Sequence, residues 1–294
     1  MSGWIAATLV AALAQSCRFL VQRHLKRTAL STGGATFSRF LFSAPLVVAG
    51  LAAYAALGTT PLPRPTPGFW AFVLPGGLTQ ILATACVITL FGLRNFAVGI
   101  TFKKSETILT ALVGLVLLGE AVSPGGLAAI AIGALAVLVL SGTPGGAWEW
   151  RAVALGIGSG ALFAVSAVCY RGAALELGEA PVLLRSGLTL AAATSWQTLI
   201  LGAWLAWREP GQLAAVARSW RLAALAGLTS MVGSFGWFTA FALQNAAYVK
   251  ALGQVEVIFS ILATTLLLGE RIVPRELAGI ALLTLSILVL ILAV

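Results

Sequence analysis

Two stretches of the chain, ETILTALVGLVLLGEAVSP at 106–124 and EVIFSILATTLLLGERIVP at 256–274, are diverged copies of one sequence, identical at 8 of 19 positions. Residues 93–140 align without gaps with residues 243–290 at a shift of 150, and 19 of these 48 positions are identical. A shared apolar composition does not produce identity at this level. An internal repeat of this period constrains the architecture before any short motif does.

The rest of the chain divides into apolar blocks of membrane-spanning length. Of the 294 residues 60% are apolar and 9% are charged, whereas a soluble domain carries about 25% charged residues. A helix of about 20 apolar residues crosses ~30 Å of hydrocarbon. The sequence therefore predicts an all-α integral membrane protein with ten transmembrane helices, at about 3–23, 31–57, 69–92, 97–118, 125–141, 152–174, 181–206, 221–243, 247–268 and 275–293.

The first parts of the two halves also correspond. A shift of 146 superposes Trp4 on Trp150 and Arg39 on Arg185. The repeating unit then has five helices, so we expect one repeat at 1–146 and a second at 147–294. Because five is odd, the second copy enters the membrane from the opposite side, and the repeats are inverted. Inverted repeats are typical of alternating-access carriers.

Two motifs resemble the EamA-type drug/metabolite transporter superfamily. They are Thr36-Phe37-Ser38-Arg39-Phe40 and Leu266-Leu267-Leu268-Gly269-Glu270, the latter followed by Pro274. The resemblance covers essentially the whole chain and implies a ten-helix secondary carrier, often an exporter, for small metabolites such as amino acids. Members often have a proline directly after the glutamate position of helices four and nine, where this chain has Thr107 and Val257. A transport mechanism that relies on a proline-induced helix break at these positions therefore cannot be carried over directly to this chain.

Two glutamates lie at membrane depth. Glu106 comes about 12 residues before the end of its predicted helix, or ~18 Å at ~1.5 Å per residue, and Glu256 occupies the same place in the repeat. A charge at this depth costs at least ~2.5 kcal/mol, so each glutamate needs a partner or a water-filled cavity. We expect both to face one central cavity as proton-coupling or amine-binding groups. The alternative is a structural clamp formed with a cation or a neighbouring helix.

Basic residues at depth outnumber these glutamates and predict that the substrate carries an anionic group. Arg18 and Arg39 are the candidate ligands, because a guanidinium is a permanently charged planar fork that suits carboxylate or phosphate. Snorkelling to the headgroups is an alternative for several of the other cations. These are Arg171, Arg185 and Lys250.

Two lysines precede the first glutamate. Lys103 lies three residues before Glu106 and shares its helix face, which favours either a substrate contact or a local ion pair. We expect the neighbouring Lys104 to point elsewhere.

Neutral side chains complete the predicted substrate site. Gln15 and Gln22 flank Arg18 at helical spacing, so one stripe of the first helix is polar and should face protein or water. Such residues can also simply hold helices together. For the mid-helix Trp237, core packing is the alternative to stacking on a substrate. The other two candidate substrate contacts are Gln80 and Gln254.

These observations predict a transporter and not an enzyme. We expect a secondary carrier, an exporter or exchanger, that moves a small polar metabolite (amino-acid-like or an organic anion) by alternating access across a plasma membrane, as a multi-pass protein of the bacterial inner membrane. The expected partners are a small-molecule substrate, the lipid bilayer and, as a candidate coupling ion, the proton. Three scattered cysteines and one histidine predict no metal site, and neither a cofactor nor nucleic acid is expected. The alternative is a membrane-embedded protein that handles a lipid or lipid phosphate.

The orientation in the membrane receives two opposed predictions. Ten basic residues fall in loops on the side opposite the N-terminus, so the positive-inside rule places both termini outside the cytoplasm. The family resemblance implies that both termini lie inside.

Overall fold

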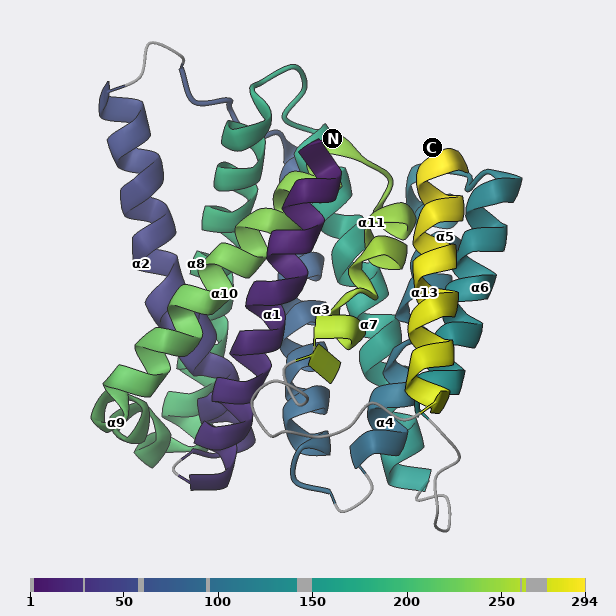
Figure 1. The fold of residues 1–294 in the computed structure, drawn as a ribbon. Helices are drawn as coiled ribbons and strands as arrows, with labels where there is room; N and C mark the ends of the chain where they lie inside the picture. The colour runs from purple at the N-terminus through teal and green to yellow at the C-terminus, as the bar shows by residue number, and fades with distance from the viewer. Residues whose placement is uncertain are drawn as a thin grey trace.

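The computed structural model describes residues 3–28, 30–57, 61–93, 96–141, 150–259, 261–262 and 274–293, and every regular element among them is a helix. Figure 1 shows the helices arranged as one bundle with both chain ends at the same end of it. The helices are α1 (Gly3–Thr28), α2 (Thr32–Leu57), α3 (Pro67–Leu90), α4 (Phe96–Lys103), α5 (Glu106–Leu118), α6 (Pro124–Ser141), α7 (Trp150–Leu175), α8 (Val182–Arg208), α9 (Pro210–Arg218), α10 (Trp220–Leu243), α11 (Ala246–Gly253) and α13 (Pro274–Ala293).

Seven of the described helices are long and apolar enough to cross a membrane, and each coincides with a predicted span. The remaining three predicted spans look different. The span at 125–141 is the shorter apolar helix α6. The span at 97–118 is divided into α4 and α5, and in the span at 247–268 a two-residue turn separates α11 from helical residues 256–259. Within the second span, residues 260 and 263–268 lie outside the described residues. The chain is thus a multi-pass α-helical membrane protein.

The two broken helices are built alike. In the first, the amides of Lys104 and Ser105 donate to the carbonyls three residues earlier, at 3.0 and 3.1 Å. In the second, the amides of Gln254 and Val255 do the same, at 3.3 and 3.1 Å. These bonds tighten the chain to a 3₁₀ turn. Each break stands 150 residues from the other and directly before a glutamate, and neither contains a proline.

Small residues let the helix backbones approach closely. Helix α10 packs along α1, where a Cβ on Gly236 would lie 2.7 Å from the carbonyl oxygen of Ala7. In α7, which packs on α3, α4 and α5, a Cβ on Gly156 would lie 2.3 Å from the carbonyl oxygen of Gly99. Such contacts depend on van der Waals packing, because in lipid there is no hydrophobic driving force for helices to associate. A Cβ on Gly160 of α7 would lie 2.9 Å from the carbonyl oxygen of Lys103, so the break before Glu106 lies directly against α7.

Candidate functional site

Two adjoining cavities lie in the middle of the bundle. We name them by their charged residues. The arginine cavity is lined by Gln15, Arg18, Arg39, Gln80, Phe163, Ser166, Ala167, Tyr170, Gly233, Ser234, Trp237, Phe238, Phe241 and Lys250. The glutamate cavity is lined by Gln15, Lys103, Lys104, Glu106, Thr107, Trp237, Lys250, Gly253, Gln254 and Glu256.

All nine sequence-predicted site residues line one or both cavities. The structure thus brings together residues from α1, α2, α3, α4, α5 and α10 and from the second broken helix. Gln15, Trp237 and Lys250 line both cavities and form the boundary between them. The roles assigned to these residues in substrate binding and coupling stay predictions.

The polar stripe of α1 turns inward, as its helical spacing predicts. Arg18 donates from Nη1 to Oε1 of Gln22 at 2.8 Å and from Nη2 to Oε1 of Gln15 at 3.4 Å. Gln22 in turn donates to the carbonyl oxygen of Ala35 on α2, at 2.9 Å. The stripe therefore fixes the Arg18 guanidinium and ties α1 to α2.

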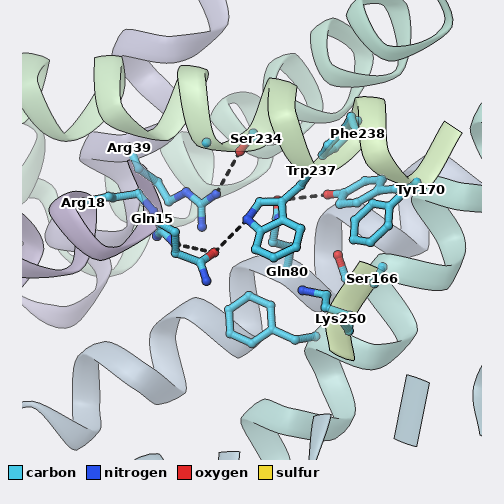
Figure 2. A pocket seen from close by; sticks show the side chains of 14 residues that line it. Gln15, Arg18, Arg39, Gln80, Ser166, Tyr170, Ser234, Trp237, Phe238 and Lys250 are labelled. Carbon is cyan, nitrogen blue, oxygen red and sulfur yellow. Dashed lines mark hydrogen bonds between the residues drawn. The ribbon is translucent and has the colours of Figure 1, made fainter. Parts of the chain in front are cut away.

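Arg39 of α2 is held by hydroxyl groups. Its Nε donates to Ser230 Oγ at 3.0 Å and its Nη1 to Thr84 Oγ1 at 3.1 Å. A longer bond of 3.4 Å joins Nη2 to Ser234 Oγ, and this bond is drawn in Figure 2. The side chain is only 3% exposed. Burial of a permanent charge is costly unless it is compensated, and neutral hydroxyls compensate it only in part.

The opposite wall carries a network of amide and phenol groups. Tyr170 donates to Oε1 of Gln80 at 3.0 Å, and the same oxygen accepts a bond from Gln197 Nε2 at 2.8 Å. Trp237 points between this wall and the arginines, where its indole Nε1 donates to Oε1 of Gln15 at 3.2 Å (Figure 2). The polar groups that surround the cavity are thus largely bonded to one another.

Neither cavity has room for a metabolite in this conformation. Each holds about 20 Å³ of free volume, and a single water needs about 10–15 Å³ by the same measure. A substrate could enter only if the surrounding helices or side chains moved apart.

In the glutamate cavity the carboxylates are paired across the two halves of the chain. Glu106 Oε1 lies 2.5 Å from Lys250 Nζ, and its other oxygen lies 3.0 Å from Lys103 Nζ. Glu256 forms an ion pair with Lys104 and accepts a bond from Gln15 Nε2 at 2.8 Å. The local pair of Lys103 with Glu106 agrees with the alternative that the three-residue spacing raised.

Lys104 was expected to point away from Glu106, and its ion pair is with the other glutamate. Lys104 is not part of the Glu106 pair, but it turns into the same cavity and reaches Glu256. Because the two-residue turn rotates α5 relative to α4, the helical wheel of a continuous helix does not describe this position. Gln254, the counterpart of Lys104 in the repeat, donates to Thr107 Oγ1 at 3.1 Å.

Lys250 was not among the predicted site residues, because snorkelling to the headgroups was left open as its alternative. Tyr170, Ser166 and Ser234 of the arginine cavity were not predicted either. A signal was available for all three, because Ser230 and Ser234 are four residues apart and thus lie on one face of α10. Tyr170 and Ser166 have the same spacing on α7.

Arg171 and Glu120 form a separate clamp. Arg171 donates from Nε and Nη2 to Oε1 of Glu120, at 2.8 and 2.7 Å, and from Nη1 to the carbonyl oxygen of Phe241, at 2.7 Å. Snorkelling therefore does not describe Arg171. The corresponding motif of the second half, at 266–270, lies outside the described residues.

Comparisons with known proteins agree with the resemblance. The model of the EamA-like transporter family matches residues 150–292. A solved structure entitled "Crystal structure of protein" superposes with a TM-score of 0.70, covering 98% of this chain and 96% of its own at 16% identity. That likeness shows the fold alone. No curated protein matches the chain. The match over residues 150–292 confirms the predicted resemblance to EamA-type transporters.

Proposed function

We propose that this EamA-type transporter is a secondary carrier that moves a small polar metabolite, amino-acid-like or an organic anion, by alternating access. The observation that supports this most strongly is the convergence of buried polar and charged groups on two adjoining cavities at the centre of the bundle. Intramembrane ionisable residues generally mark substrate or ion pathways. Export or exchange across a bacterial inner membrane is the activity proposed.

The proposed architecture is a pair of inverted five-helix repeats, 1–146 and 147–294. Two observations support it. The breaks before Glu106 and Glu256 have the same hydrogen-bond pattern at a separation of 150 residues. The close packing of α1 on α10 has its counterpart in the packing of α7 on α3, as a two-fold relation between the halves requires.

Alternating access is supported by the closed state of the cavities and by the way they are held closed. The free volume is too small for a metabolite, so the substrate must be admitted by a second conformation. The ion pairs Lys250–Glu106 and Lys104–Glu256 join one half of the chain to the other. Relative movement of the halves would break these pairs, and exchange of their partners would give the carrier two stable arrangements.

Within this proposal the predicted residues have distinct roles. Arg18 and Arg39 hold the anionic group, while Glu106 and Glu256 couple transport to protons or accept a substrate amine. The remaining substrate contacts are Gln15, Gln80, Lys103, Trp237 and Gln254.

Reconstitution tests the proposal. Full-length protein in liposomes preloaded with unlabelled succinate or aspartate should take up radiolabelled succinate or aspartate by counterflow. Vesicles with Arg39→Gln protein should lose this uptake, and vesicles with protein altered at the exposed Arg151 (Arg151→Gln) should keep it. A C-terminal reporter that is active only in the cytoplasm decides between the two predicted orientations.

A further inference from the structure

The two central cavities contain more positive than negative charge. Five cationic side chains and two carboxylates line them, an excess of three positive charges among the described residues. In a medium of low dielectric such an excess is unfavourable unless an anion compensates it. The inference that follows rests on the proposed carrier function and concerns the substrate class of that site.

The excess is concentrated at the two arginines. Arg18 and Arg39 line the same cavity and are both 3% exposed. In the described part of the chain their hydrogen-bond partners are all neutral, two amides for Arg18 and three hydroxyls for Arg39. An arginine does not lose its proton in a protein. These two charges therefore persist whatever the state of the lysines, and they repel each other.

Lys250 adds a third cation at the boundary of the two cavities. Its Nζ lies 4.6 Å from the centre of the Trp237 ring and 5.6 Å from that of Phe241, so it sits over the aromatic side of the arginine cavity. Its carboxylate partner, Glu106, keeps a second lysine in Lys103. Lys250 can therefore turn to an anion in the arginine cavity without leaving Glu106 unpaired.

The arginine cavity is poorly suited to the ammonium group of a substrate. None of its described lining residues is a carboxylate. The amide oxygens of Gln15 and Gln80 already accept bonds, from Arg18 and Trp237 and from Tyr170 and Gln197 respectively. An amine placed here would meet three cations and occupied acceptors. An amino acid is thus a poorer match than an anion of similar size without an amine.

We propose that the arginine cavity binds a dianion without an ammonium group, with its carboxylate or phosphate oxygens on Arg18, Arg39 and Lys250. The planar guanidinium forks suit paired oxygens, and the ring of Trp237 covers the apolar part of the ligand. The substrate is then an organic dicarboxylate or a phosphate ester and not a zwitterionic amino acid.

A matched pair of probes tests the proposal without any substitution. Succinate and aspartate differ in one amino group, which leaves succinate with two net negative charges and aspartate with one at neutral pH. Thermal unfolding of the purified full-length protein in uncharged detergent should shift upward with succinate or inorganic phosphate. The apparent Kd for succinate should be at least tenfold lower than that for aspartate. Equal or tighter binding of aspartate overturns the proposal and leaves the carrier function intact.

Substitutions locate the effect. Lys250→Gln should raise the apparent Kd for succinate at least tenfold. The Arg151→Gln control should bind succinate as the unaltered protein does. Added phosphatidic acid tests the other source of a phosphate dianion. Stabilisation by this lipid alone, or by none of the anions, overturns the proposal of a soluble dianion. Counterflow with the two labelled probes then decides separately whether the protein is a carrier.

Discussion

Lys250 reaches Glu106 across the two halves of the chain, with 2.5 Å between Nζ and Oε1. The reciprocal pair joins Lys104 to Glu256. Each glutamate that follows a helix break is thus neutralised by a lysine of the opposite half. This arrangement couples the two broken helices, so that neither can shift far without exchanging an ion-pair partner.

Loss of the first glutamate should destabilise the bundle. Glu106→Gln leaves two buried lysines without their carboxylate, and removal of one partner of a buried pair costs about 3–5 kcal/mol. Unfolding by sodium dodecyl sulfate in mixed micelles measures this. The double variant with Lys250→Gln should be less destabilised than the sum of the single variants, because the residues are in contact. If the losses in stability of the two single variants simply add in the double variant, the ion pair does not contribute to stability.

The second glutamate tests coupling to protons. Glu256→Gln should abolish flux or its pH dependence while the protein stays folded, because an amide cannot release or accept the proton that a carboxylate can. The amide oxygen can still accept the bond from Gln15. Flux is measured in liposomes at two pH values. Unchanged flux with unchanged pH dependence rules out the coupling role and leaves the clamp with Lys104.

Two neighbouring glycines of α7 provide a matched pair. Gly156→Ala places a methyl group 2.3 Å from the carbonyl oxygen of Gly99, and overpacking of this kind costs about 1–3 kcal/mol. Gly158→Ala meets nothing within 4 Å, so it should be neutral or stabilise by up to ~1 kcal/mol, since alanine is the better helix residue. Thermal unfolding in detergent compares the two. Equal effects would contradict close packing of α4 on α7.

The clamp outside the cavities should affect stability and not binding. Glu120→Gln weakens the two bonds from Arg171, and hydrogen bonds to charged groups contribute about 1.5–3 kcal/mol. The affinity for succinate should not change, because neither residue lines the arginine cavity or the glutamate cavity. Loss of succinate binding in a folded Glu120→Gln protein would place the clamp in the binding machinery.

Much of the site could be predicted because depth and spacing are local properties. The polar stripe through Arg18 was bound to turn away from lipid, and the mid-membrane position of Glu106 followed from counting residues to the helix end. Hydroxyl ligands such as Ser230 and Ser234 were missed because serine is common in membrane helices and carries no charge to mark it. Lys250 was missed because a lysine near a helix end can equally well snorkel.

The sequence by itself determined the membrane-spanning blocks, the internal repeat and the residues that must avoid lipid, since each follows from hydropathy, length and helical period. Only the tertiary structure decided where the helices break and which charges meet. Thr107 and Val257 stand where a proline would have signalled a break, and the breaks form nonetheless, directly before Glu106 and Glu256. The partner of Lys104 lies 152 residues away. Such a partner is set by how helices cross in space, and no local pattern contains that information.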